Sequence, residues 1–336
     1  MKRNIKYILI QFFVIFLSIE LILRISGIFK TYSEKIGNGY ISYYGQILPT
    51  WYHRWTPSSK HCFNQPEFNY CYQYNSLGLR DREWINNPPD SIKRVIILGD
   101  SFTEGDGAPE KENFPTYLEN MLNEKTVSWE VYNGGVCGND PFYNLKFFNT
   151  IIVPNYEYDV LMLLVNNSDI ADYIYRGGME RFHKDSTTHF RKAPWFESII
   201  HYSHTARAIL KYSKYIWPEE SEKRIKAIHE IAEVYVEINR EIQRRNKKMV
   251  VVIHTFPGTI SRNEGESDEI NKIESLLSTS DVPYINICAN MQNEFSNFTY
   301  DKYAWKENGH FKSFGYKVFS DIIFEEANTK YPDLLK

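Results

Sequence analysis

The stretch that most constrains the fold of this chain is Val95-Ile96-Ile97-Leu98, followed at once by Gly99-Asp100-Ser101. Four consecutive apolar residues, three of them β-branched, are typical of a strand that is buried on both faces of a sheet. A serine at the carboxyl end of such a strand lies where open α/β sheets bind their ligands. Ser101 is therefore a candidate nucleophile at the mouth of a crevice.

The same residues have a simpler interpretation. Ser101 is followed three residues later by Glu104, which is the spacing of a capping box. In that motif the two side chains bind N–H groups at the start of a helix and perform no chemistry. A second signal far downstream favours catalysis: Glu307-Asn308-Gly309-His310-Phe311, followed by Gly315 and an apolar-periodic helix.

Strands and helices alternate from Arg94 onward. Apolar, β-branched runs predict strands at 94–99, 128–133, 158–165, 248–255 and 283–287. Apolar residues at helical spacing predict helices at 114–124, 141–150, 221–246, 267–278 and 313–327. Alternation of this kind predicts an α/β fold, in which a five-stranded, mostly parallel sheet is covered by helices on both faces.

Residues 1–28 predict a signal anchor. Basic residues precede an uncharged run at 7–19, and Glu20 stands four residues before Arg24, the spacing of an ion pair on a helix. The basic start places the N-terminus in the cytoplasm and the rest outside, in the periplasm or at the cell surface. Because no small-residue cleavage site follows, the segment is interpreted as an uncleaved membrane anchor. The alternative is a buried N-terminal helix.

Two further parts follow the anchor. Residues 29–92 are rich in Tyr, Trp, Pro and Asn and predict an irregular, aromatic-packed segment. Residues 93–330 predict the main domain. Within it, 170–220 interrupts the alternation of strands and helices, so we interpret it as an insertion over the carboxyl edge of the sheet, a lid or a substrate wall.

Net charge and cysteine content argue against a nucleic-acid partner and a structural zinc site. A net charge of -3 gives no electrostatic footprint for nucleic acid. Cys62 and Cys71 flank a short loop and could form a disulfide in an oxidising compartment. Cys137 and Cys288 stand beside predicted strand ends and are expected to be buried thiols. The chain contains no CxxC pair, so no structural zinc site is expected.

Gly99-Asp100-Ser101 after a buried strand, with Gly309-His310-Phe311 near the C-terminus, resembles the SGNH (GDSL-type) hydrolases, most closely their membrane-anchored bacterial members. The resemblance runs from about Arg94 to Ser320. It implies a three-layer α/β/α, flavodoxin-like fold with Ser101 as the nucleophile and His310 as its base. Such a pair suits acyl transfer, because a neutral histidine can remove the proton that makes a serine hydroxyl a weak nucleophile.

The resemblance also implies an oxyanion hole. The Ser101 N–H would be one donor and the Gly138 N–H, after the second strand, another. An asparagine after the third strand would be the last, and Asn167 is the assignment. The usual Gly-x-Asn-Asp is absent here, so Asn166 and Ser168 stay as alternatives.

The group that orients the histidine also departs from the family's pattern. The family's aspartate, three residues before the histidine, is replaced by Glu307, with Asn308 and Asp301 as alternatives. His254 follows the fourth strand and is expected to be a packed or hydrogen-bonded residue. The remaining histidines of the insertion show no metal-ligand spacing, and the predicted chemistry needs neither a metal nor another cofactor.

Three functions are compatible with these residues. The leading one is a membrane-anchored serine esterase outside the cytoplasm, acting on O-acyl esters of small molecules or glycans, with O-acetyl groups on a glycan as one example. The second is an O-acyltransferase that modifies a cell-surface polysaccharide, in which a sugar hydroxyl instead of water accepts the acyl group. The third is a catalytically silent envelope protein that binds glycan in the same crevice.

Overall fold

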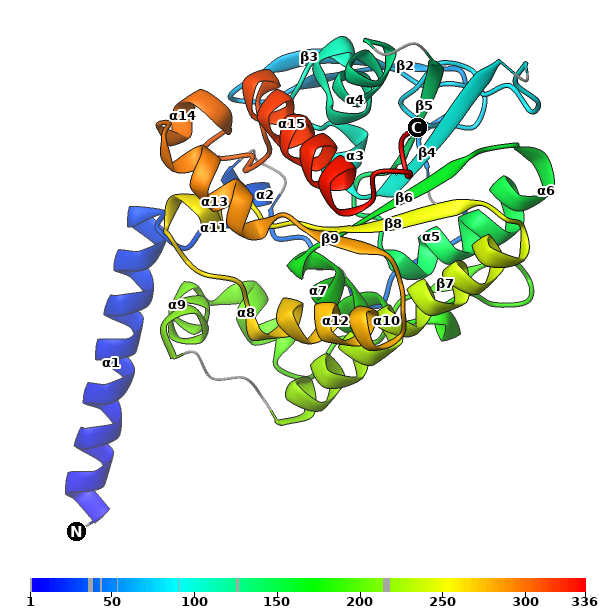
Figure 1. Cartoon of the computed structure of the whole chain (residues 1–336). Coiled ribbons are helices and arrows are strands. Elements are labelled where there is room, and N and C mark those ends of the chain that lie inside the picture. The colour runs from blue at the N-terminus through cyan, green and yellow to red at the C-terminus, as the bar shows by residue number, and fades with distance from the viewer. Residues whose placement is uncertain are drawn as a thin grey trace.

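The computed structural model describes residues 2–35, 39–42, 44–52, 54–89, 91–124, 127–213 and 218–336. Its centre is a five-stranded sheet in which every neighbouring pair is parallel (Figure 1). The strands are β4 (Ile92–Gly99), β5 (Ser128–Gly135), β6 (Val160–Val165), β8 (Lys248–Ile253) and β9 (Tyr284–Asn286). The predicted α/β fold with a five-stranded parallel sheet is confirmed.

The strand order places a crevice beside β4. Across the sheet the strands follow the order β5-β4-β6-β8-β9, so the chain leaves β4 first toward one edge and later toward the other. Open α/β sheets bind ligands at this kind of switch, outside the carboxyl ends of the strands. β4 ends at Gly99 and β6 ends at Val165, so the residues that follow these strands share one site.

Helices cover both faces of the sheet (Figure 1). One face carries α4 (Phe114–Asn123), α13 (Cys288–Ser296) and α15 (Ser313–Lys330). The other carries α5 (Pro141–Phe147), α7 (Asn167–Arg176), α10 (Pro218–Arg244) and α12 (Asp268–Thr279). Successive residues of β4 pack against opposite helical layers, since Ile96 lies in one hydrophobic cluster while Val95 and Ile97 lie in the other.

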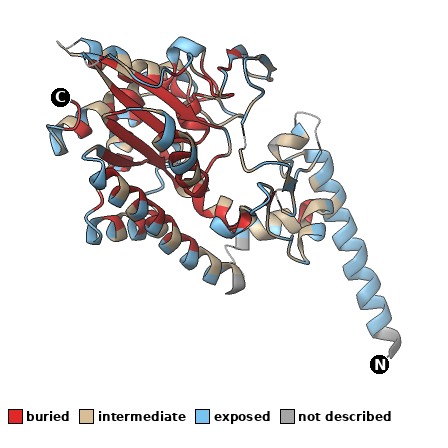
Figure 2. Cartoon of the chain, turned by 90° about the vertical axis from the view of Figure 1, so that its right-hand side faces the viewer, coloured by how far each residue is buried: buried red, intermediate tan, exposed pale blue. Residues whose placement is uncertain are grey.

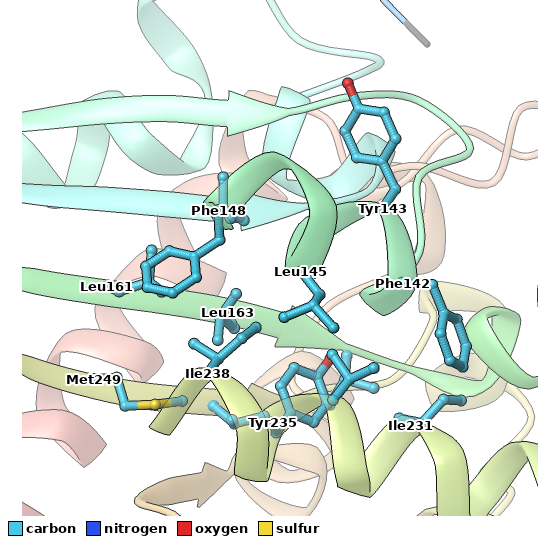
Figure 3. Packing of buried hydrophobic residues seen from close by; sticks show 14 of the residues in the cluster. Phe142, Tyr143, Leu145, Phe148, Leu161, Leu163, Ile231, Tyr235, Ile238 and Met249 are labelled. Carbon is cyan, nitrogen blue, oxygen red and sulfur yellow. The ribbon is translucent and has the colours of Figure 1, made fainter. Parts of the chain in front are cut away.

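The helical spacing in 221–246 has the expected result. Ile231, Tyr235 and Ile238 of α10 are buried and lie toward β6 and α5 (Figure 3). They pack in the same cluster as Leu161 and Leu163 of β6. The apolar stripe of this helix therefore forms one wall of the core, as a period of 3.6 residues requires.

Shorter elements complete the part of the chain that the structure describes. They are α2 (Tyr32–Lys35), β1 (Ile47–Leu48), β2 (Lys60–Asn64), β3 (Asn69–Gln73), α3 (Ser101–Glu104), η1 (Glu110–Glu112), the π-helix η2 (Phe148–Ile152), α6 (Val153–Asn155), η3 (Met179–Arg181), β7 (Thr188–His189), α8 (Glu197–Tyr202), α9 (His204–Ser213), α11 (Pro257–Ser261) and α14 (Tyr300–Tyr303). The insertion expected at 170–220 is thus more regular than its sequence indicates. It carries most of α7, then η3, β7, α8 and α9.

The segment before the sheet contains an antiparallel hairpin. β2 pairs with β3, and Cys62 lies opposite Cys71, to which it is joined by a disulfide. β1 pairs with β7 and so connects this segment to the insertion. Of the other two cysteines, Cys288 is buried as expected. Cys137 is exposed instead, because it stands in the loop after β5 and not within the strand.

The N-terminal helix α1 (Lys2–Ser26) projects from the domain, and its residues are mostly exposed (Figure 2). Within it, Ile5–Ser26 has a mean hydropathy of 2.4 and is long and apolar enough to cross a membrane. None of its most apolar window is buried against the rest of the chain, so the alternative of a buried N-terminal helix is wrong.

Candidate active site

Ser101 is the first residue of the short helix α3, directly after β4. The residue that caps this helix is Asp100, whose Oδ1 accepts a hydrogen bond from the Phe102 N–H at 2.9 Å. Ser101 therefore does not cap the helix, and Glu104 binds other partners. The capping-box interpretation of Ser101 and Glu104 is wrong, and the Ser101 hydroxyl is free to face the crevice.

The Ser101 hydroxyl lies against His310. The Oγ atom of Ser101 is 2.6 Å from the Nε2 atom of His310, although 209 residues separate them. The imidazole also packs against the Phe102 ring, with 4.8 Å between ring centroids. A serine in hydrogen-bond contact with a partly buried histidine has the geometry of a nucleophile and its base.

Asn308, not Glu307, holds the other side of the His310 ring. Asn308 Oδ1 lies 2.7 Å from His310 Nδ1 and also accepts the His310 backbone N–H at 3.2 Å. The Asp106 carboxylate is the next group, with Oδ2 at 3.5 Å from Nδ1. Gly309 makes this turn possible, because its φ of +83° is a conformation that other residues rarely adopt.

The structure places Glu307 away from the ring. Its carboxylate pairs with Lys35 at the surface. A second acidic residue explains this orientation: the Glu67 carboxylate accepts the backbone N–H groups of Lys306, Glu307 and Asn308 at 2.9, 3.0 and 2.8 Å. Glu67 lies between β2 and β3, so this hairpin fixes the histidine loop. The prediction of Glu307 as the orienting residue is replaced by Asn308.

This replacement can be tested with a pair of variants. We expect Asn308→Ala to lower kcat for an aryl acetate on the order of 10²-fold, because the His310 ring loses the acceptor that fixes its tautomer. The matched variant Glu307→Ala removes only a surface ion pair and should change kcat by less than about twofold. Steady-state kinetics of both variants decides between them, and a larger loss in Glu307→Ala would reverse the assignment.

The loop after β5 brings Gly138 to the same crevice. Ser101 and Gly138 both line the cavity described below. Among the described residues neither backbone N–H has a hydrogen-bond partner, so both are free to donate to a ligand. Gly138 has a φ of +73°, which positions its peptide in a way that favours glycine. On its other side its carbonyl accepts a hydrogen bond from Arg176.

Glu104 ties this loop to the nucleophile's helix. It is buried, and its Oε2 accepts the Cys137 N–H at 2.5 Å, one residue before Gly138. Its Oε1 accepts hydrogen bonds from Trp55 Nε1 at 2.9 Å and from the Tyr74 hydroxyl at 3.2 Å. One carboxylate therefore joins α3, the loop after β5 and the aromatic-rich segment before the sheet.

Glu104 predicts a pH dependence of stability. Burial raises the pKa of its carboxyl from 4.5 to about 7, against the opposing charge of Arg80. The folded protein therefore keeps a proton that the unfolded chain releases, so this contribution is full below about pH 4.5 and is lost as the pH rises through about 7. Between roughly pH 5 and 8 the native protein should lose about 3 kcal/mol of its free energy of unfolding relative to Glu104→Gln. The variant does not lose it because its amide does not titrate. Thermal unfolding across this range measures it. A constant difference would mean that Glu104 stays ionised.

The asparagine that follows β6 caps a helix and does not donate to an oxyanion. Asn166 caps α7, and its Nδ2 donates to Asp100 Oδ2 at 2.9 Å and lies 3.2 Å from His254 Nε2. Both amide hydrogens are thereby engaged. Asn167 Oδ1 accepts a hydrogen bond from Ser267 at 2.8 Å, and Asn167 does not line the cavity. The structure therefore does not bring the predicted Asn167 to Ser101. Of the three candidates only Ser168 lines the cavity.

His254 is buried beneath the site. Its ring lies between Phe102 and Phe319, at centroid distances of 5.3 and 5.4 Å. Burial lowers the pKa of its imidazole, which favours the neutral form. A neutral ring can accept the Asn166 amide at Nε2. This agrees with the packed, hydrogen-bonded role predicted for His254, and it adds a chain from His254 through Asn166 to Asp100.

A cavity of about 760 Å³ opens over Ser101 and His310. Its walls are rich in aromatic rings and also contain arginines: Trp51, Tyr143, Tyr175, Phe182, Phe190, Phe256, Tyr300, Arg176, Arg181 and Arg262. Several of them come from residues 170–220, so this segment contributes to the wall of the cavity. Within the described residues no group of three or more His, Cys, Asp or Glu side chains is arranged to hold a metal ion.

No protein-family model matches the sequence, and no curated protein matches it. Among solved structures the chain is similar to LAE5, an alpha/beta hydrolase enzyme from the metagenome of Lake Arreo, with 12% identity, 73% of this chain and 96% of that chain covered, and a TM-score of 0.45. It is also similar to the acetylxylan esterase Axe2 of Geobacillus stearothermophilus (12% identity, 70% and 93% covered, TM-score 0.43). A third is the acetyl xylan esterase AlAXEase (16% identity, 69% and 98% covered, TM-score 0.43). Likenesses of this size decide neither family nor activity.

Proposed function

We propose that this protein is a serine hydrolase that cleaves carboxylic esters, with Ser101 as the nucleophile and His310 as its base. The observation that carries the proposal is the 2.6 Å contact between Ser101 Oγ and His310 Nε2, at the carboxyl end of the central strands. A buried hydroxyl–imidazole pair can be purely structural. The open cavity over it and the two free N–H groups beside it favour catalysis.

The hydrogen bonds of His310 fix its tautomer. Because Asn308 Oδ1 accepts at Nδ1, the neutral ring carries its proton on Nδ1 and presents the Nε2 lone pair to Ser101. As Ser101 Oγ attacks the ester carbonyl carbon, Nε2 takes the hydroxyl proton. The imidazolium then gives this proton to the leaving alcohol, which leaves an acyl group on Ser101. Water activated by the same nitrogen releases the acid.

Two groups share the work that one carboxylate does in many triads. The Asn308 amide orients the ring but carries no charge. Asp106, at 3.5 Å from Nδ1, supplies the negative charge that stabilises the imidazolium. The amide thus fixes the orientation of the ring, and the carboxylate stabilises the imidazolium that forms during the reaction.

The oxyanion of the tetrahedral intermediate needs donors that are already in place. The Ser101 and Gly138 N–H groups fit this role, since both lie in the cavity wall with no other partner among the described residues. Ser168 also lines the cavity, but its hydroxyl and its backbone N–H both donate to Asn166 Oδ1 at 2.8 Å, so the Ser101 and Gly138 N–H groups are the donors we propose. Arg176 and Glu104 hold the Gly138 loop from either side.

The walls of the cavity favour a glycan ester as substrate. Flat aromatic rings stack on the apolar faces of sugars, and Trp51 and Tyr175 lie in the walls. The Cys62–Cys71 disulfide and the apolar helix α1 support a location outside the cytoplasm, anchored to a membrane. We therefore propose an anchored esterase that removes acyl groups, such as acetyl, from glycans at that surface.

The proposal is tested by treating the full chain with a fluorophosphonate and locating the adduct by mass spectrometry. A single adduct on Ser101 is the expected result. An unlabelled but folded protein would contradict catalysis and favour a glycan-binding role. Product analysis with an acylated glycan and a free glycan acceptor then separates hydrolysis from transfer. Free acid alone supports the esterase, whereas acylated acceptor supports an O-acyltransferase.

A further inference from the structure

Helix α1 is attached to the catalytic domain well before its end. The Glu20 carboxylate accepts the N–H groups of His204 and Thr205 at 3.0 and 2.8 Å, and the Ser203 hydroxyl at 2.9 Å, at the start of α9. Arg24, which pairs with Glu20, donates to the Tyr202 carbonyl at the end of α8. Six residues, about 9 Å of helix, separate Glu20 from the end of α1 at Ser26.

This attachment determines which part of the domain lies at the membrane surface. The uncharged run 7–19 before Glu20 has a length of only about 20 Å as a helix. The hydrocarbon core of a bilayer is about 30 Å thick. If α1 crosses the bilayer, the core must therefore extend as far as Glu20, and the parts of the domain that contact Glu20 lie at the membrane surface.

Helix α8, whose Tyr202 carbonyl binds Arg24, and Trp195, two positions before this helix, expose large apolar and aromatic side chains. Trp195, Ile199 and Tyr202 are 72%, 50% and 70% exposed, and we call them the α8 surface. Ile199 and Tyr202 line a groove together with Phe16, which stands one turn before Glu20 on the membrane side. The α8 surface is therefore continuous with the apolar surface of α1.

The domain is also held in one orientation beside α1. Arg207 of α9 donates to the Phe29 carbonyl at 3.0 Å and pairs with Glu34. The Tyr40 hydroxyl donates to Glu197, the first residue of α8, at 3.0 Å. The residues after α1 thus bind to both α8 and α9, so the α8 surface stays at the level of the membrane.

From this geometry we infer that the α8 surface is a second membrane contact, which inserts into the boundary between headgroups and acyl chains of a phospholipid bilayer. Trp and Tyr are the residues that favour this boundary, because each has an apolar ring and a polar group. The inference is independent of the proposed catalysis. The insertion would then both line the active-site cavity and bind the domain to the membrane surface.

Quenching of tryptophan fluorescence by brominated lipid tests this contact. The full chain is reconstituted in phosphatidylcholine vesicles with plain or brominated acyl chains. The chain has 7 tryptophans, of which the first is Trp51, so α1 contributes no signal. We expect Trp195→Phe to remove most of the bromolipid-dependent quenching. The control Trp129→Phe, a buried residue at the amino end of β5, should not lower it.

A second variant separates contact from misfolding. Ile199→Glu adds a charge at an exposed position, so the fold should persist while quenching of Trp195 falls and its accessibility to aqueous iodide rises. Equal bromolipid quenching in Trp195→Phe and the native protein would overturn the inference. So would a photo-crosslinker at position 199 that captures a second protein chain and no lipid.

Discussion

Ser101→Ala should lower kcat/KM for an aryl acetate by about 10⁴-fold or more, with little change in folding. The hydroxyl makes the bond to the acyl carbon, and it is the group in hydrogen-bond contact with His310 Nε2. The residual rate would come from the oxyanion donors and from binding alone. Hydrolysis of p-nitrophenyl acetate by the detergent-solubilised full chain measures the loss.

The control for this variant is Ser261→Ala. Ser261 is exposed on α11, and its hydroxyl only donates to the nearby Gly258 carbonyl, so we expect unchanged kinetics. Both variants should unfold at nearly the native temperature. A Ser101→Ala protein that retains more than about a tenth of the native activity would contradict the role of nucleophile.

His310→Ala should cause a loss of the same order, and it should slow the fluorophosphonate reaction by about 10³-fold or more. Without the imidazole, the Ser101 hydroxyl loses the base that accepts its proton as the bond to phosphorus forms. The rate of labelling, followed by intact-mass spectrometry, reports this step separately from substrate binding.

The double variant gives the sharper test. Residues that act as one unit lose their function together, so Ser101→Ala with His310→Ala should be no slower than either single variant. Multiplied losses would instead mean that the two side chains contribute independently, and the proposed transfer of a proton between them would be wrong.

The central strand could be predicted from its residues alone. Val95, Ile96, Ile97 and Leu98 are all fully buried, with neighbouring residues in opposite clusters, which is what four apolar residues in a row require of a strand between two helical layers. The period in α10 was equally informative. Both predictions depend on the spacing of apolar residues within one element, and this spacing can be read from the sequence.

The partner of His310 depends on a turn and on a distant carboxylate. The resemblance to the SGNH family implied Glu307, which stands where that family has an aspartate, three residues before the histidine. In the structure Glu67 binds three consecutive N–H groups of that loop and Gly309 takes a positive φ, so Asn308 reaches the ring. Glu67 lies some 240 residues earlier in the chain, so no local pattern could reveal this contact.

Asn167 illustrates a different limit. An asparagine at a strand end can be a cap, a turn residue or a donor to a ligand, and the sequence is the same in each case. Contacts with distant residues determine the role of each asparagine. Asp100 and His254 engage both amide hydrogens of Asn166, and Ser267 binds Asn167. Such competition is visible only when all five side chains are placed in space.

The β2–β3 hairpin has a consequence for the size of the smallest catalytic unit. Its turn carries Glu67, the anchor of the loop that holds His310, and its two strands are joined by the Cys62–Cys71 disulfide. A fragment that begins at residue 92 would contain all of the sheet and the nucleophile, yet its histidine loop would lack the contact with Glu67. The boundary of the working enzyme therefore lies upstream of Lys60, and a reducing compartment would loosen the site from a position outside the α/β domain.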